Sequence, residues 1–309
     1  ESRIATIREP DEREDRLSAM YRPQKTIYAR VENFLPGIAG KDSDQGLWHQ
    51  VREADALIQV IRNFSAFGQQ APTVVPDINA LDQEMILADQ VVVEKRLERI
   101  AADRGRSRAV DEQELALLEE CRQMLEAETP LRRRPELAAA PALRGFAFVS
   151  GKPLLVLFNN ADEDDDLPPQ ATEVEEQNCM VIRGKIEQEL AQMDEDEAAE
   201  FLAEFEIGAA ATDRVIRASY ELLGLASFFT VGEDEVRAWT IRRQLPAMEA
   251  AGVIHTDMQK GFIRAEVVAY DDLMAAGTHA EARKRGTVRL EGKTYPVADG
   301  DIINFRFNV

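Results

Sequence analysis

The chain has 309 residues, a formal net charge of −20 and a hydrophobic fraction of 45%, which is enough apolar material for two or three domains. It contains no run of about 18 apolar residues, so the sequence predicts no membrane span. Two cysteines, Cys121 and Cys179, indicate no disulfide framework and favour a reducing cytoplasm. The acidic balance argues against non-specific nucleic-acid binding, because phosphate backbones attract lysine and arginine.

The acidic charge is concentrated in the first three quarters of the chain. Residues 226–309 contain 12 acidic and 11 basic side chains, which leaves a net charge of −1 there and −19 upstream. A nearly neutral C-terminal domain can therefore still present a basic surface.

The first part of the chain alternates between helical and strand-like segments. A turn and a charged helix are expected from Pro10, and the apolar residues of 46–52 have helical spacing. The continuous apolar run from Pro153 is typical of a parallel strand that is covered on both faces. Together these segments predict an open α/β sheet, in which ligands bind at the carboxyl ends of strands. The segments that resemble strands are 26–32, 55–62, 153–159 and 179–182.

A different pattern occupies residues 81–128. Apolar residues recur at helical spacing on both sides of a basic turn at 103–108, which predicts two long antiparallel helices inserted into the sheet domain. The apolar stripe is more simply explained by packing of the two helices against each other than by a binding surface. The turn carries Arg104, Arg106 and Arg108, and we expect this exposed tip to contact a partner.

The C-terminal segment has the pattern of a small mixed domain. Residues 263–269 alternate as in a half-buried strand, and 272–285 have the polar start and basic last turn of a helix. A hairpin is expected between 288–290 and 294–297, followed by a final strand from Asp301.

Other catalytic or metal-binding groupings are weak. The three histidines, His49, His255 and His279, lie in separate segments without cysteine pairs at ligand spacing, so zinc is not expected. The acidic runs 164–166 and 194–197 lack the loop pattern of a calcium site, and the second run is better explained as a helix cap.

Several motifs carry a resemblance to a known family. The segments AGVIHTD (251–257), KGFIRAEV (260–267), YDDL (270–273) and DGDIINFRFNV (299–309) resemble the C-terminal TGS domain of the YchF family. These proteins are Obg-like ATPases among the translation-factor-related P-loop NTPases. Similar landmarks continue upstream at PDER (10–13), VREADA (51–56), EMILAD (84–89), VEKRLER (93–99), NADE (160–163), AAEFL (198–202) and YELLGLASFFT (220–230).

The resemblance implies a domain organisation and a function. It implies a P-loop NTPase-type α/β domain, with its N-terminal part missing, from 1–70 and 141–224, a coiled-coil hairpin over 71–140, and a TGS β-grasp domain over 225–309. It further implies binding and hydrolysis of ATP in preference to GTP, with Mg²⁺, by a monomer that associates with the ribosome or another large assembly.

The resemblance also places the nucleotide base. GTPases recognise guanine with Asn-Lys-x-Asp after a strand, and the family has Asn-x-x-Glu instead, here Asn160 to Glu163. Asn160 would support the loop, the backbone of Ala161 would face the adenine edge, and Glu163 would end the motif. The family's Ser-Ala-Lys loop corresponds to Arg183 and Gly184, followed by a lysine. Without the resemblance, the same residues read as a strand end followed by a solvated acidic loop.

Two departures from the family leave two functions open. No Gly-x-x-x-x-Gly-Lys-Ser/Thr loop, which cradles phosphates, occurs in these residues. The family's Asp-x-Ala-Gly corresponds to 37–40 or 35–37, and neither placement supplies the aspartate. We therefore predict no catalytic or metal-ligating residue in this chain. The alternatives are a nucleotide-hydrolysing ATPase and a non-hydrolysing adaptor that binds partners through its hairpin and TGS domain.

The resemblance places the strand that leads into the phosphate loop between 26–32 and 56–61. We expect either a segment upstream of Glu1 that supplies this strand, or direct pairing of its two neighbours, since unpaired buried backbone groups cost about 1–3 kcal/mol each. An intact mass several kilodaltons above the 34.6 kDa of these residues would demonstrate the segment. A mass equal to that value would refute it.

Overall fold

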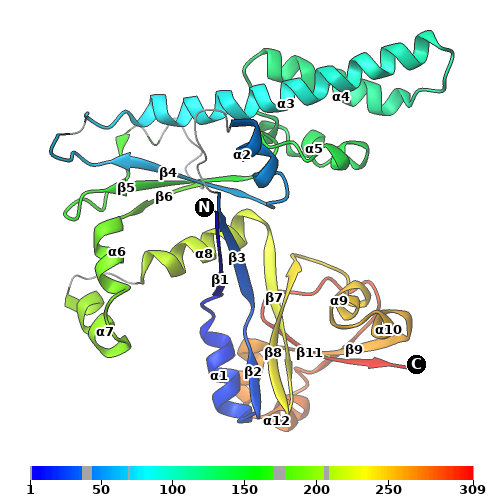
Figure 1. The fold of residues 1–309 in the computed structure, drawn as a ribbon. Coiled ribbons are helices and arrows are strands. Elements are labelled where there is room, and N and C mark those ends of the chain that lie inside the picture. Colours follow the sequence, from blue (N-terminus) through cyan, green and yellow to red (C-terminus); the bar gives the residue numbers. More distant parts are fainter. Residues whose placement is uncertain are drawn as a thin grey trace. The chain divides into compact units, whose positions relative to one another are not determined.

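The computed structural model describes residues 2–36, 44–68, 70–169, 171, 178–204 and 209–308. The chain divides into two compact units (Figure 1). The central unit comprises Glu1–Ile4 and Phe34–Thr212, and the terminal unit comprises Ala5–Asn33 and Asp213–Val309. None of the helices in the described residues combines the length and hydrophobicity needed to cross a bilayer.

The central unit contains a parallel sheet of three strands, in the order β4-β5-β6. The strands are β4 (Leu57–Asn63), β5 (Leu154–Asn160) and β6 (Cys179–Ile182). The predicted strands 55–62, 153–159 and 179–182 are thus confirmed to within two residues. β5 lies in the middle and is buried along almost its whole length, which explains its uninterrupted apolar sequence.

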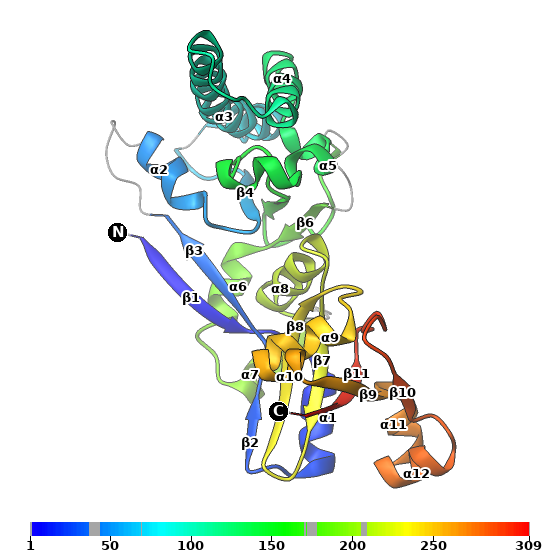
Figure 2. The same cartoon turned by 90° about the vertical axis from the view of Figure 1, so that its right-hand side faces the viewer.

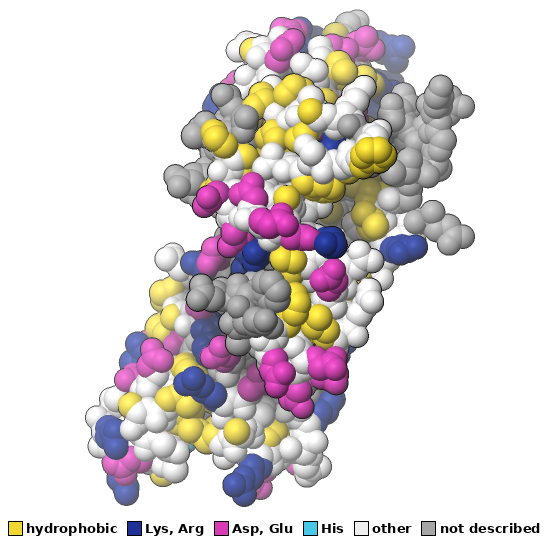
Figure 3. Space-filling view, turned by 90° about the vertical axis from the view of Figure 1, so that its left-hand side faces the viewer, with side chains coloured by type: hydrophobic (Ala, Val, Ile, Leu, Met, Phe, Trp, Pro, Cys, Tyr) yellow, Lys and Arg dark blue, Asp and Glu magenta, His cyan; other side chains and the backbone are white. Residues whose placement is uncertain are grey.

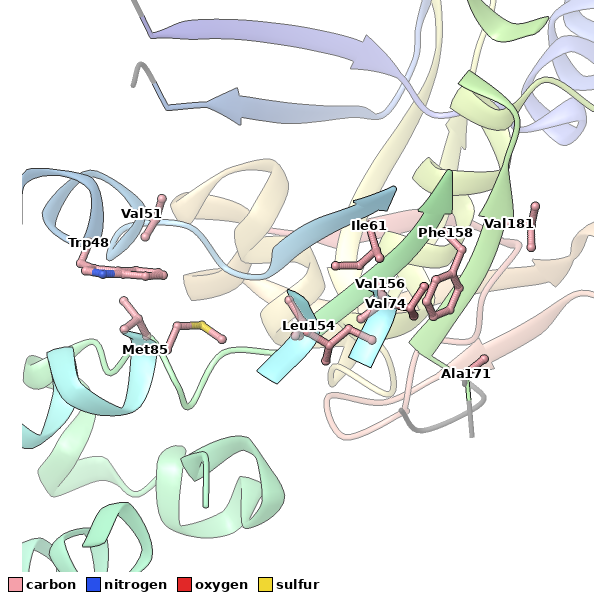
Figure 4. Close-up of a cluster of buried hydrophobic side chains, with 12 residues drawn as sticks. Trp48, Val51, Ile61, Val74, Met85, Leu154, Val156, Phe158, Ala171 and Val181 are labelled. Atoms are coloured by element: carbon pink, nitrogen blue, oxygen red, sulfur yellow. The ribbon is translucent and has the colours of Figure 1, made fainter. Parts of the chain in front are cut away.

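The core of the central unit lies against this sheet (Figure 4). Phe158 and Val156 are fully buried on β5, and Met85 contributes a fully buried side chain from helix α3 (Val74–Gly105). Trp48 belongs to helix α2 (Asp44–Val51), and it packs in the same cluster as Met85. One long helix therefore covers the sheet with its first half and leaves its second half for other contacts.

The second half of α3 runs antiparallel to α4 (Glu112–Glu126), as predicted for residues 81–128 (Figure 1). Buried Val93, Ile100, Leu118 and Leu125 form their shared core. The remaining elements of the unit are η1 (Leu131–Arg133), α5 (Pro135–Ala138), η2 (Pro141–Phe146), α6 (Gly184–Leu190) and α7 (Glu195–Glu204), with α8 (Ala211–Leu222) at the boundary between the units.

A buried carboxylate connects α3 to the segment that leads into β5. Asp89 is fully buried, and its oxygens accept hydrogen bonds from the backbone N–H groups of Val149 (3.0 Å) and Ser150 (2.7 Å). The guanidinium of Arg52 lies 3.4 Å away. Burial raises the pKa of Asp89, while these donors and the arginine charge oppose the shift. The landmark EMILAD thus ends in a residue that fixes α3 to the sheet.

The terminal unit contains a six-stranded sheet in the order β10-β9-β11-β7-β8-β2 (Figure 2). Aromatic and alanine side chains pack on one face under α9 and α10, and a second buried cluster on the other face includes Leu17 of α1 and Leu273 of α11. The elements are α1 (Glu12–Tyr21), β2 (Lys25–Ile27), β7 (Leu225–Val231), β8 (Glu235–Arg242), α9 (Ala247–Ile254), α10 (Thr256–Lys260), β9 (Phe262–Ala269), α11 (Tyr270–Ala276), α12 (His279–Lys284), β10 (Arg289–Glu291) and β11 (Asp301–Phe307).

The structure corrects the expected domain division. Residues 1–70 were predicted to belong to the nucleotide-binding domain, yet Ala5–Asn33 belongs to the terminal unit. The reason is that β2 pairs in parallel with β8, and α1 packs against the same sheet. The predicted strand 26–32 is divided between β2 and β3 (Arg30–Leu35), and β3 pairs with β1 (Arg3–Arg8). Direct pairing with β4 is absent from the described residues.

Two further predictions for the C-terminal segment were wrong. The single helix over 272–285 is two helices, α11 and α12, because Gly277 adopts a φ of 76° and the hydroxyl of Thr278 caps α12. The hairpin between 288–290 and 294–297 does not form. β10 pairs with β9 instead, and 294–297 contribute only an isolated bridge at Pro296. The strands over 263–269 and from Asp301 are confirmed as β9 and β11.

Helix α1 buries a carboxylate that has no hydrogen-bond partner. Glu14 is fully buried, and neither of its carboxylate oxygens is hydrogen-bonded within the described residues. Burial raises the pKa of Glu14 to about 8, and the negative charge of Asp11 adds to the effect while Arg8 opposes it. The folded state therefore favours the neutral carboxyl group, whereas the unfolded chain ionises it near the ordinary value of 4.5.

We predict that Glu14→Gln stabilises the protein at neutral pH. The wild-type carboxyl group contributes fully to stability below pH 4.5, and this contribution is lost as the pH rises through about 8. The advantage of the variant should therefore grow between these pH values to the order of a few kcal/mol. Urea unfolding across that range measures it, with Glu12→Gln, an exposed position on the same helix, as the control. An equal advantage at every pH would contradict the assignment.

Candidate functional site

The three parallel strands of the central unit end at one common edge. Asn63 of β4 pairs in register with Asn160 of β5, and Asn159 pairs with Ile182 of β6. The first loop leaves this edge at Ala161, and the second is the short connection at Arg183 that leads directly into α6 at Gly184. Because ligands of open α/β sheets bind at the carboxyl ends of strands, this edge is the candidate site. It brings together all five residues that the sequence predicted.

Asn160 is a buried residue that positions the first loop. Its side-chain oxygen accepts a hydrogen bond from Nδ2 of Asn63 (2.9 Å), and its own Nδ2 donates to the carbonyl of Asp166 (2.8 Å). The side chain is only 3% exposed. Both the oxygen and the nitrogen of the Asn160 amide are hydrogen-bonded within the protein, so this side chain fixes the loop over 160–166. A ligand would therefore contact the neighbouring residues and not the Asn160 side chain.

Those neighbours are more accessible. The carbonyl of Ala161 accepts a hydrogen bond from the N–H of Asp164 (3.1 Å), which closes a turn directly after the strand. Glu163 lies in this turn and is exposed. Its carboxylate makes no hydrogen bond or ion pair among the described residues, so it is available to a ligand. The backbone around Ala161 and the carboxylate of Glu163 are therefore the groups that the first loop can offer.

Four contacts attach the second loop to the end of β5 and to the first loop, and one of them is the ion pair between Arg183 and Asp165 (3.7 Å). The N–H of Gly184 donates to Oδ1 of Asn159 (2.9 Å), and Nζ of Lys185 lies 2.7 Å from Oδ2 of Asp162. This hydrogen bond raises the pKa of Lys185. The guanidinium of Arg183 reaches the carbonyl of Asp162 (3.5 Å). The two loops thus form one connected rim rather than two independent segments.

Two residues of this rim were not predicted from the sequence. Asn63 holds the side chain of Asn160, and Asn159 holds the N–H of Gly184. The signal that could have indicated Asn63 is that two apolar strands, 57–63 and 154–160, both end in asparagine. To recognise this signal, one must know that β4 and β5 pair in register, which only the tertiary structure shows.

The described residues offer little further chemistry. They contain no group of three or more His, Cys, Asp or Glu side chains that could hold a metal ion. Residues 37–40, aligned with the family's Asp-x-Ala-Gly, lie outside the described residues. His255 caps α10 by accepting a hydrogen bond from the N–H of Asp257 (3.2 Å). Cys121 is fully buried, and burial raises its pKa to about 11, so the thiol stays protonated.

Comparison with known proteins agrees with this architecture. The family model YchF-GTPase_C, described as a protein of unknown function (DUF933), matches residues 225–308. The Ribosome-binding ATPase YchF of Bacillus subtilis (strain 168) is 38% identical over 331 residues, covering 99% of this chain and 89% of the relative. Obg-like ATPase 1 of Oryza sativa subsp. japonica is 33% identical, covering 99% of this chain and 82% of the relative.

A solved structure extends the similarity to the fold. The Schizosaccharomyces pombe YchF GTPase superposes with a TM-score of 0.84 at 27% identity, over 98% of this chain and 87% of the other. The protein is thus an α/β protein with the fold of that GTPase. Given the identity to the bacterial relatives along nearly its whole length, the chain belongs to the YchF family.

We predict that Gly184→Ala destabilises the rim of the site. A Cβ at this position would lie 3.0 Å from the amide atoms of Asn159, so the hydrogen bond from the N–H of Gly184 to the side chain of Asn159 must shift, at a cost of about 1–3 kcal/mol. Urea unfolding provides the measurement. Gly145→Ala is the matched control, because a Cβ there meets nothing within 4 Å. Equal stabilities of the two variants would contradict the close packing.

Proposed function

We propose that this protein binds a nucleoside triphosphate at the carboxyl edge of β4, β5 and β6, as an ATPase of the YchF and Obg-like type. The observation that carries the proposal is the connected rim, in which buried Asn160 fixes the first loop and the Asn159–Gly184 hydrogen bond attaches the second. Such a rim provides preformed backbone groups at the place where open α/β sheets bind ligands.

The groups on the rim favour binding of adenine and lack the features of guanine-selective binding. Guanine selectivity needs a carboxylate that accepts both N–H donors of the base, supported by a lysine after the asparagine. Here Ala161 stands at the lysine position, and Glu163 carries a longer side chain than the aspartate of that motif. We infer that the backbone at Ala161 faces the edge of the base, that Arg183 and Gly184 border it, and that ATP binds at least as well as GTP.

The described residues offer fewer groups for the phosphates and Mg²⁺ than for the base. These residues contain no Gly-x-x-x-x-Gly-Lys-Ser/Thr loop, and the described side chains form no cluster that fits a metal ion. The described groups therefore fit the base end of a nucleotide and do not fit the magnesium ion. Hydrolysis would need groups outside the described residues, and no step of it is assigned to the side chains of the rim.

A large partner is the second part of the proposal. Relatives from Bacillus subtilis and Escherichia coli O157:H7 are named ribosome-binding ATPases, and we propose the ribosome as the partner of this protein in the cytoplasm, with the protein acting as a monomer. The contacting parts would be the tip of a coiled-coil hairpin formed by α3 and α4, and the C-terminal domain, which we interpret as a TGS β-grasp domain over 225–309.

A non-hydrolysing adaptor is the second candidate, and a gene that encodes no Gly-Lys-Ser/Thr loop upstream of Glu1 would favour it. Full-length protein incubated with labelled ATP or GTP and Mg²⁺ distinguishes the two functions when binding and hydrolysis are measured separately. Binding with turnover supports the ATPase, binding without turnover supports the adaptor with a retained site, and binding of neither nucleotide refutes the nucleotide site.

We predict that Ala161→Lys combined with Glu163→Asp moves nucleotide preference toward GTP. The change restores the lysine and the shorter carboxylate that accepts both guanine donors. Competition of ATP and GTP against a fluorescent nucleotide gives the ratio of dissociation constants. The control is Ala191→Lys with Glu189→Asp, which makes the same change at exposed positions two residues apart. A strong GTP preference of the unmodified protein would contradict the proposal.

A further inference from the structure

Helix α1 and strand β2 form one excursion of the chain onto the terminal sheet (Figure 1). β2 is the last strand in the sheet order, and it pairs with β8 over three residues. The hydroxyl groups of Ser18 and Thr26 join α1 to β2 (2.8 Å), and Leu17 of α1 packs in one buried cluster with Phe229 of β7. A single helix and a short edge strand can leave a sheet while its other strands stay paired. This excursion is therefore suited to local opening.

Glu14 lies on the face of α1 that the sheet buries. It and Leu17 are the two buried residues of the helix. The Glu14 side chain is 0% exposed, and neither of its carboxylate oxygens accepts a hydrogen bond from the described residues. The backbone of Ala238 on β8 opposes the rise of the Glu14 pKa without forming a hydrogen bond. Because a buried carboxylate without donors is far costlier than a neutral carboxyl group, the docked helix suits the protonated form.

The charged groups nearest to Glu14 do not compensate its ionised form. Asp11 and Glu9 act on it with negative charge, and Arg8 acts with positive charge. The guanidinium of Arg8 is already paired with Asp15 at 2.7 Å. Ionisation of Glu14 therefore adds a third negative charge beside two carboxylates, with an arginine that has another partner.

The remaining neighbours do not supply a free cation either. Arg13 donates hydrogen bonds to Asp11 (2.8 Å) and to Asp299 (2.9 Å), just before β11. The phenol of Tyr28 is neutral, because burial, first of all, and nearby carboxylates raise its pKa. β7 and β8 pack apolar side chains against this side of α1. Neither arginine is therefore free to balance an ionised Glu14.

The charge of the whole chain acts in the same direction. The net charge is −20, and Asp and Glu side chains gather on the face shown in Figure 3. A negatively charged molecule raises the free energy of any further negative charge. Exposure to water is thus the means by which Glu14 can ionise, and exposure requires α1 to leave the sheet.

We propose that α1 and β2 form a proton-controlled latch on the terminal sheet, closed while Glu14 is protonated and opened when Glu14 ionises. Opening moves the carboxylate into water and uncovers apolar side chains of β7 and β8, among them Phe229 and Val236. The two states differ in their affinity for one proton, so pH shifts their populations. The latch lies within the terminal unit and does not depend on the proposed nucleotide site.

The direction of the pH dependence follows from the two environments of Glu14. Burial raises its pKa to about 8 in the closed state, whereas the ordinary value is 4.5. The carboxyl group contributes fully to closure below pH 4.5, and this contribution is lost as the pH rises through about 8. The ratio of open to closed molecules should therefore rise about tenfold per pH unit between these values and stay level above them.

The test is native-state hydrogen exchange of the full chain, followed by mass spectrometry between pH 5.5 and 9 at low urea concentrations. Exchange rates of the α1 and β2 amides, divided by those of unstructured peptides, give the opening constant. The constant of wild type relative to Glu14→Gln should rise about tenfold per pH unit up to about pH 8. Glu14→Leu, which also removes the titration, should match Glu14→Gln. Glu12→Gln, at an exposed position of the same helix, should match wild type.

Urea separates opening of the latch from unfolding of the whole unit. Local opening exposes little surface, so exchange of α1 and β2 should depend weakly on urea, whereas exchange of β9 and β11 should depend on it strongly. Three results would overturn the inference: a ratio of wild type to Glu14→Gln that is constant with pH, equal urea dependence in all four elements, or an effect of Glu12→Gln as large as that of Glu14→Gln. Equal urea dependence would leave the predicted gain in stability of Glu14→Gln intact.

Discussion

The central unit depends on the burial of β5 between β4 and β6. Parallel pairing satisfies the backbone of this strand on both sides, and its apolar side chains fill the core on which α2 and α3 pack. The same pairing sets the position at which each strand ends. Because β4 and β5 end in register at Asn63 and Asn160, two polar side chains meet where the apolar layer stops. The candidate site is a direct consequence of that register.

Buried carboxylates are used in three different ways in this protein. Asp89 accepts hydrogen bonds from two backbone N–H groups and lies beside an arginine, and it joins α3 to the segment that leads into β5. Glu266 is satisfied by two arginines and orders an exposed surface. Glu14 has no hydrogen-bond partner among the described residues and favours its neutral form. A buried charge is costly unless it is paired, so the partners decide whether such a residue anchors, orders or destabilises.

The rim at the end of β5 and the face around Glu266 differ in what they offer a ligand. The rim offers backbone groups and exposed carboxylates such as that of Glu163, on a loop held by the hydrogen-bonded side chains of Asn63 and Asn160. The face around Glu266 offers guanidinium groups with donors to spare. The rim thus presents neutral donors and acceptors as well as carboxylates, whereas the face around Glu266 presents positive charge.

The sequence by itself was sufficient for those features that depend on local patterns. The apolar run 153–159, the helical spacing of 81–128 and the motifs shared with the YchF family predicted the strands, the two long helices, the family and the candidate site loop. Tertiary structure alone decided that β2 joins the terminal sheet, that β10 pairs with β9, and that Asn63 supports Asn160. Strand pairing and the grouping of arginines around Glu266 join residues far apart in the chain. Periodicity reports which face of an element is buried, but not which element covers it.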